Sequence, residues 1–175
     1  MIQARGVPGA IEVRVDDIAF FDGDAIVRPV NAMLQATTPV MRRLEQAAGP
    51  KLPGIVRLSQ PLPVGAAVVT GAGALTVELL VHGVVSSPEE PVSRETVRLA
   101  LMSALQRAVA FEIRSIAVAP FGLGAGNLDI DDSADVMVDV LTEHMRRAPF
   151  PASVLIVAET ELELEALQRR LGSTA

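Results

Sequence analysis

The segment DIAFFDGDAIVRPVN, from Asp17 to Asn31, decides which fold the sequence predicts. It follows Ile11 to Val15, where apolar and charged residues alternate as in a half-buried strand. Inside the segment, Ala25 to Val27 is a short apolar run that we expect to form a second strand, with Asn31 isolated beyond it. Open α/β sheets bind ligands beyond the carboxyl ends of their strands, so these polar residues mark a candidate binding edge.

Strand and helix patterns alternate along the rest of the chain, which predicts one three-layer α/β/α domain over residues 1–175. Helix signals include Ser93 and Ser133 as expected N-caps. We expect helices over 39–48, 94–111, from about 134, and 159–171, and further strands over 66–70, 79–85, 115–119 and 153–158.

Composition excludes several classes of protein. Half of the 175 residues are hydrophobic, enough for a sizeable core, but no run approaches the roughly 20 apolar residues of a membrane span. The N-terminus lacks a hydrophobic signal-peptide core, so we expect a cytoplasmic location. With no Cys and only His82 and His144, neither thiol catalysis nor a multi-histidine metal site is expected, and we predict no cofactor.

The charge balance argues against general nucleic-acid binding. The formal net charge is −6, and neither Trp nor Tyr is present for base stacking. Arg42 and Arg43 form a local basic group, which we interpret as the exposed face of a helix. The many apolar residues also allow a homo-oligomer, although no stretch identifies its interface.

A glycine-rich segment, PFGLGAGN from Pro120 to Asn127, follows the buried-type strand 115–119. Glycines at such a position let backbone N–H groups approach a phosphate closely. A plain chain-turning role is the alternative. The ligand-binding candidates of this loop are Phe121, Gly122, Gly124 and Gly126.

The segment from Asp17 to Asn31 resembles the opening of the macrodomains, the ADP-ribose-binding modules, which reads roughly GDIT-x4-DAIVNAAN. The run Ser115 to Pro120 with its glycine-rich continuation, and the apolar strands ending at His82, resemble further elements of that family. The resemblance implies a mixed, mostly parallel sheet and ADP-ribose or a related nucleotide as ligand. It places Asp17 at the adenine amino group, Asn31 at the distal ribose and the glycine loop around the phosphates.

The chain departs from the family where that family does its chemistry. Arg28 replaces the first Asn of the motif, and Ala36 to Pro39 replaces a glycine loop that grips phosphate. Met41 stands where the hydrolysing members carry an Asp, and a thioether cannot activate water. Leu123 stands near the usual hydroxyl residue of the second loop.

Arg28 has two interpretations. Its planar guanidinium suits a phosphate, which makes it a candidate ligand-binding residue. Alternatively it forms an ion pair with Asp16, Asp17 or Asp24 and blocks the pocket.

The leading hypothesis is therefore a macrodomain-like binding module without catalytic residues. A structural or interaction module with a degenerate, ligand-free pocket is the first alternative. The second is a hydrolase of ADP-ribose conjugates in which Asn31 positions the substrate for a bound water, and Met41 weighs against it.

Overall fold

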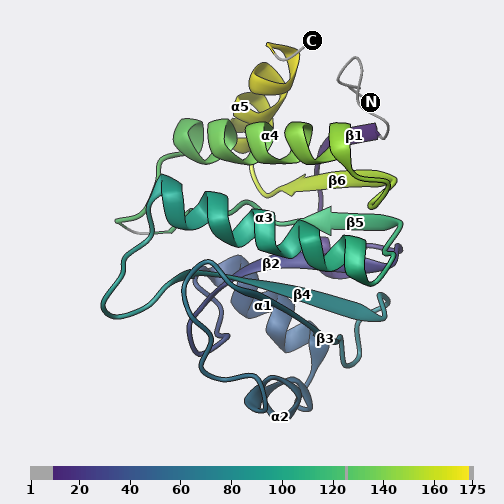
Figure 1. The fold of residues 1–175 in the computed structure, drawn as a ribbon, viewed down its shortest axis with the longest axis vertical. Coiled ribbons are helices and arrows are strands. Elements are labelled where there is room, and N and C mark those ends of the chain that lie inside the picture. The colour runs from purple at the N-terminus through teal and green to yellow at the C-terminus, as the bar shows by residue number, and fades with distance from the viewer. Residues whose placement is uncertain (1–9, 125, 174–175) are drawn as a thin grey trace.

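The computed structural model describes residues 10–124 and 126–173 (Figure 1). In this part of the chain six strands form one sheet, in the order β1-β6-β5-β2-β4-β3. All neighbouring strands are parallel except β3, which is antiparallel to β4, so the mixed, mostly parallel sheet is confirmed. The strands are β1 (Ala10–Val15), β2 (Ala25–Asn31), β3 (Ala67–Gly71), β4 (Leu79–Ser86), β5 (Ser115–Val118) and β6 (Ser153–Ala158).

Helices cover both faces of the sheet, as Figure 1 shows, which confirms the three layers. One face carries α3 (Arg94–Ala110), α4 (Ile130–Arg147) and α5 (Glu161–Gly172). The other carries α1 (Pro39–Ala48), α2 (Leu52–Arg57) and the short 3-10 helix η1 (Ile18–Phe20). No helix within the described residues is both long enough and apolar enough to span a membrane. Residues 1–9, on which the expected cytoplasmic location rests, lie outside them.

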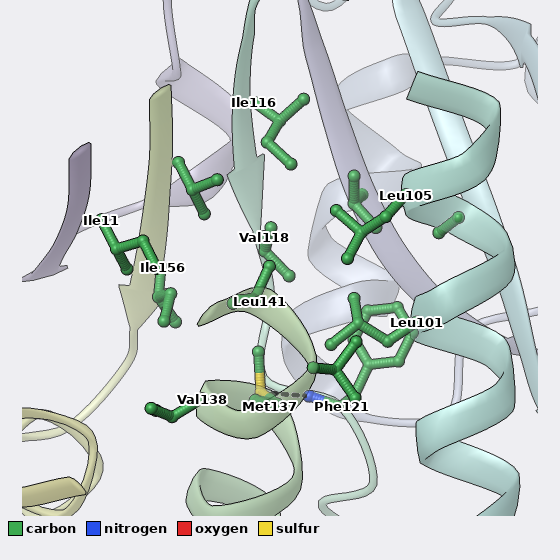
Figure 2. Packing of buried hydrophobic residues seen from close by; sticks show 14 of the residues in the cluster. Ile11, Leu101, Leu105, Ile116, Val118, Phe121, Met137, Val138, Leu141 and Ile156 are labelled. Carbon is green, nitrogen blue, oxygen red and sulfur yellow. Dashed lines mark hydrogen bonds between the residues drawn. The ribbon is translucent and has the colours of Figure 1, made fainter. Parts of the chain in front are cut away.

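The larger core lies between the sheet and the α3, α4 and α5 layer (Figure 2). Ile116 and Val118 of β5 meet Leu101 and Leu105 of α3 and Met137 of α4 there, all almost fully buried. β5 is buried on both faces, which explains its continuous apolar sequence. Because this core fixes β5 and β6, it also fixes the positions of the loops that leave their carboxyl ends.

Side-chain caps define where the helices begin. Ser93 accepts a hydrogen bond from the N–H of Thr96, so its predicted capping role is confirmed. The predicted cap at Ser133 is wrong: α4 begins at Ile130, and Asp129 accepts from the N–H of Asp132 at 2.8 Å. Asp and Ser both cap helices well, and the earlier Asp129 takes this one. Ser133 instead lies inside α4 and donates to the carbonyl of Phe121.

Strand β2 is longer than the predicted run from Ala25 to Val27, because it continues through Pro29 to Asn31. β5 pairs only with Ala25 to Val27, so the missing N–H of Pro29 removes no hydrogen bond to that neighbour. β4 supports β2 along its whole length. The extension carries Asn31 to the edge of the sheet where the binding site was expected.

Candidate functional site

A cleft of about 640 Å³ opens beyond the carboxyl ends of β1, β5 and β6. Its walls come from the start of η1, the first turns of α1, the segment after β5 and the segment after β6. This is where open α/β sheets hold ligands, and the volume lies within the roughly 300–1,000 Å³ usual for small-molecule sites. The lining residues are Asp16, Asp17, Ile18, Thr38, Pro39, Val40, Met41, Arg43, Ala119, Pro120, Leu123, Gly124, Val157, Ala158, Glu159 and Glu163.

Asp17 lies at the wall of the cleft formed by η1. Its Oδ1 accepts the N–H of Ala19 at 3.0 Å and so caps η1. Oδ2 has no hydrogen-bond partner within the described ranges 10–124 and 126–173. The carboxylate therefore combines a structural role with a second acceptor oxygen that remains available to a ligand.

Two loops approach one another at the cleft, the segment before α1 and the glycine-rich loop after β5. A Cβ added at Gly124 would lie 3.4 Å from the carbonyl oxygen of Thr37 and 3.0 Å from Nδ2 of Asn127. The φ of Gly124 is +131°, which disfavours any larger residue as well. The N–H groups of Leu123 and Gly124 donate to no acceptor in the described part of the chain, so they remain free for an anion.

The first loop enters α1 through a tight cap. Thr38 Oγ1 accepts from the N–H of Met41, and Pro39 occupies the first turn. The cap and the proline together remove two of the donors that a helix N-terminus otherwise offers to an anion. Met41 itself lines the cleft with only 2% of its surface exposed.

Asn31 lies at the end of β2 and is not among the residues that line the cleft. Its Oδ1 accepts the N–H groups of Met33 and Gln35, at 3.0 and 3.1 Å, and its Nδ2 donates to Oε1 of Gln35. These bonds close the turn after β2. A contact between Asn31 and a ribose stays a prediction.

Arg28 is fully buried and does not line the cleft, so we leave it out of the candidate site. The expected ion pair with Asp16, Asp17 or Asp24 is wrong, because the partner is Glu45 of α1, with Nη1 2.8 Å from Oε2. Nη2 donates to the carbonyl of Leu34 and Nε donates to Nδ1 of His82. Glu45 Oε2 also accepts the N–H of Ala36, so the pair holds the chain that leads into the first loop.

His82 of β4 completes this buried network as a hydrogen-bonded structural residue. Because Arg28 donates to Nδ1, the neutral ring carries its proton on Nε2, which lies 2.7 Å from Oγ1 of Thr70. Burial, reinforced by the charge of Arg28, holds the pKa of His82 well below its ordinary value. Burial also lowers the pKa of Arg28, while the hydrogen bond and charge of Glu45 oppose that shift.

The four candidate residues of the glycine-rich loop differ in whether they lie in the core, at the surface or at the cleft. Phe121 is fully buried in the core beside Leu101 and Met137 (Figure 2), so we leave it out of the site. Gly122 is buried with φ +88°, and its carbonyl accepts the N–H of Leu128. Gly126 is exposed and does not line the cleft. Of the four loop candidates, Gly124 is the one at the cleft wall.

The charged residues of the cleft were largely missed from sequence. Arg43 of α1 forms an ion pair with Glu159, which directly follows β6, and both line the cleft. Glu163 of α5 accepts the N–H of Glu159. A position immediately after the predicted strand 153–158 was a usable signal for Glu159, because it lies at a carboxyl strand end.

A larger hollow, of about 780 Å³, lies between α3 and α4. Its arginines are held by neighbouring carboxylates, Arg98 by Glu95 and Arg170 by Asp135 and Asp139. None of its lining residues comes from the segments that follow the carboxyl ends of the strands, so the smaller cleft is the candidate site. In the described residues no group of three or more His, Asp or Glu side chains is placed to hold a metal ion.

Comparison with known proteins agrees with this architecture. The sequence model of the Macro domain matches residues 27–137. The chain belongs to the macro domain family.

An O-acetyl-ADP-ribose deacetylase of Enterobacter sp. is 30% identical to this macrodomain over 167 residues, or 92% of this chain and 93% of that enzyme. An uncharacterised protein of Mycobacterium tuberculosis is 30% identical over 134 residues, or 77% of this chain. The matched residues make up 37% of the Mycobacterium tuberculosis protein, so this chain spans little more than a third of the length of that relative.

Solved structures confirm the macrodomain fold. A variant of the Oceanobacillus iheyensis macrodomain with ADP-ribose has a TM-score of 0.85 at 20% identity, covering 95% of this chain and 94% of that one. The macro domain of ganglioside induced differentiation associated protein 2 has a TM-score of 0.86 at 17% identity, covering 99% and 88%. At these identities the likeness shows the fold alone.

Proposed function

We propose that this macrodomain binds ADP-ribose or a related nucleotide in the cleft and does not hydrolyse it. The observation that carries the proposal is the combination of groups at the cleft wall. Asp17 supplies a free acceptor oxygen suited to the adenine amino group, and Leu123 and Gly124 supply free N–H donors suited to phosphate. Solved macrodomains with ADP-ribose and with ADP support the ligand class.

The first loop sets the expected strength of binding. Thr38 and Pro39 leave few donors for phosphate, so we expect affinity that is roughly micromolar, near −8 kcal/mol. Asp17 contributes through a hydrogen bond to a charged acceptor, a contact worth about 1.5–3 kcal/mol.

Isothermal titration calorimetry with ADP-ribose tests the proposal. Asp17→Asn keeps the size of the side chain and an oxygen that can cap η1, so we expect a weakening of about 10-fold to 100-fold without unfolding. Asp22→Ala is the matched control, since Asp22 is an exposed carboxylate of the same segment outside the cleft lining. Absence of heat for the wild-type chain across adenine nucleotides would refute the proposal and favour a ligand-free interaction module.

Hydrolysis of an ADP-ribose conjugate is the second candidate, favoured by the 30% identity to the O-acetyl-ADP-ribose deacetylase. The buried thioether of Met41 opposes it, because the cleft then has no proton acceptor at that position. We expect no release of acetate from O-acetyl-ADP-ribose above the rate in buffer. Turnover that disappears in Asp17→Asn would establish the second candidate instead.

A further inference from the structure

Arg43 lies on the face of α1 that forms one wall of the cleft. Pro39 and Arg43 are four residues apart and therefore stand one above the other on the helix. Helical side chains lean toward the N-terminus, so Arg43 covers the turn that begins with Pro39. Its long side chain thus belongs to the end of α1 that faces the glycine-rich loop, and it is 63% exposed.

The Arg43 guanidinium is held by Glu159, which lies on a different wall. Glu159 follows β6, is 36% exposed and also lines the cleft. The ion pair therefore spans the cleft from α1 to the end of the sheet. Exposed pairs of this kind are weak, since water screens both charges and both side chains lose freedom. A ligand with more negative charge can therefore displace Glu159 from Arg43 with only a small loss of free energy from the broken ion pair.

Among the described charged side chains that line the cleft, Arg43 stands alone against several carboxylates. The carboxylates there are Asp16, Asp17, Glu159 and Glu163, and in the described lining Arg43 is the one positively charged side chain. The first loop, with its capped and proline-blocked turn, offers little to neutralise a diphosphate.

We propose that Arg43 is a specificity-determining residue that leaves Glu159 to pair with the diphosphate of the bound nucleotide, an inference that rests on the proposed function. A guanidinium binds phosphate oxygens through two parallel N–H bonds, and a diphosphate carries more negative charge than the single carboxylate of Glu159, so the charge attraction is larger. Glu159 then acts as a competitor that holds Arg43 at the cleft until a ligand with sufficient charge arrives. Nucleosides without phosphate gain nothing from this exchange.

Calorimetry with ADP-ribose, ADP and adenosine tests the inference on four proteins: the wild type, Arg43→Ala, Glu159→Gln and the matched control Arg42→Ala. Arg42 is the neighbouring exposed arginine of α1 and does not line the cleft. Arg43→Ala should weaken ADP-ribose and ADP about tenfold, or about 1.4 kcal/mol, and change adenosine by less than about twofold. Glu159→Gln should strengthen the two phosphate ligands by about twofold to fivefold, because it removes the competitor. Arg42→Ala should match the wild type.

Two results would overturn the inference while leaving the proposed function intact. One is equal affinity of Arg43→Ala and the wild type for ADP-ribose. The other is an equal loss for adenosine and ADP-ribose, which would show that Arg43 supports the shape of the cleft instead of the diphosphate. If the wild-type chain binds none of the three ligands, the inference fails together with the proposed function.

Discussion

Arg28 of β2 and Glu45 of α1 form an ion pair in which Nη1 lies 2.8 Å from Oε2 and the arginine is fully buried. The same Oε2 accepts the N–H of Ala36. One carboxylate therefore neutralises a charge inside the sheet and holds the chain that leads to the ligand-facing loop.

Glu45→Ala is expected to destabilise the domain by about 3 kcal/mol, because it leaves a buried guanidinium without its counter-charge. Glu45→Gln also removes the counter-charge but keeps an acceptor oxygen, so it should lose less, about 2 kcal/mol. Urea unfolding measures both, with the exposed neighbour Gln46→Ala as control. A Glu45→Ala protein as stable as the control would show that the pair contributes nothing.

Stability should fall as the pH drops below about 6.5, the pKa of an unfolded histidine. Burial and Arg28 lower the pKa of folded His82, so in this range the unfolded chain binds the proton and the folded chain does not. The free energy of unfolding should therefore decrease by up to about 1.4 kcal/mol per pH unit, down to the folded pKa, and level off above about 6.5.

Urea unfolding at a series of pH values checks this, with His82→Asn as the comparison. The variant should be less stable near neutral pH and show a shallower slope between about pH 5 and 6.5. Parallel slopes for the two proteins would mean that His82 does not account for the pH dependence.

Gly122→Ala is expected to cost about 2–4 kcal/mol. A Cβ there would lie 2.8 Å from Cγ2 of Val97 and 3.0 Å from Cδ1 of Leu128, at a φ of +88°. Gly126→Ala is the matched control, because its Cβ meets no atom within 4 Å and it carries only the strain of φ +78°, about 1 kcal/mol. Thermal unfolding of the two variants compares them, and equal shifts in Tm would refute the steric argument.

Ser133→Ala should destabilise the domain by about 1–2 kcal/mol, since its Oγ donates to the carbonyl of Phe121 at 2.6 Å in a buried environment. This bond joins α4 to the start of the glycine-rich loop, so amide hydrogen exchange at Asn127 and Leu128, whose N–H groups donate to carbonyls of that loop, should also accelerate. Ser153→Ala, at the exposed start of β6, serves as control. Unchanged hydrogen exchange in that loop would show that Ser133 does not hold the glycine-rich loop in place.

The elements with strong local signals were predictable from sequence. β5 and β6 are continuous apolar runs, and Ser93 is followed by a regular helical pattern. The start of α4 was not predictable, since Asp129 and Ser133 are both plausible caps. Only the folded structure separates them, because Ser133 donates its hydroxyl to the carbonyl of Phe121 instead of capping the helix.

The site itself depends on pairs that are distant in sequence. Arg28 had three nearby carboxylates, yet it bonds to Glu45 of α1, because the strand points that side chain under the helix. Arg43 and Glu159 are 116 residues apart, and only the completed sheet brings them to the same cleft. The local spacing of residues in the sequence therefore predicts neither of these two ion pairs.

The central claim is that a nucleotide binds in the cleft at the carboxyl ends of β1, β5 and β6. Nitrogen-15 amide shifts recorded during titration with ADP-ribose test it most directly. We expect the largest shifts at Ile18, Val40, Leu123 and Gly124, with saturation at roughly micromolar ligand. Shifts confined to the hollow between α3 and α4, or none at millimolar ligand, would contradict it.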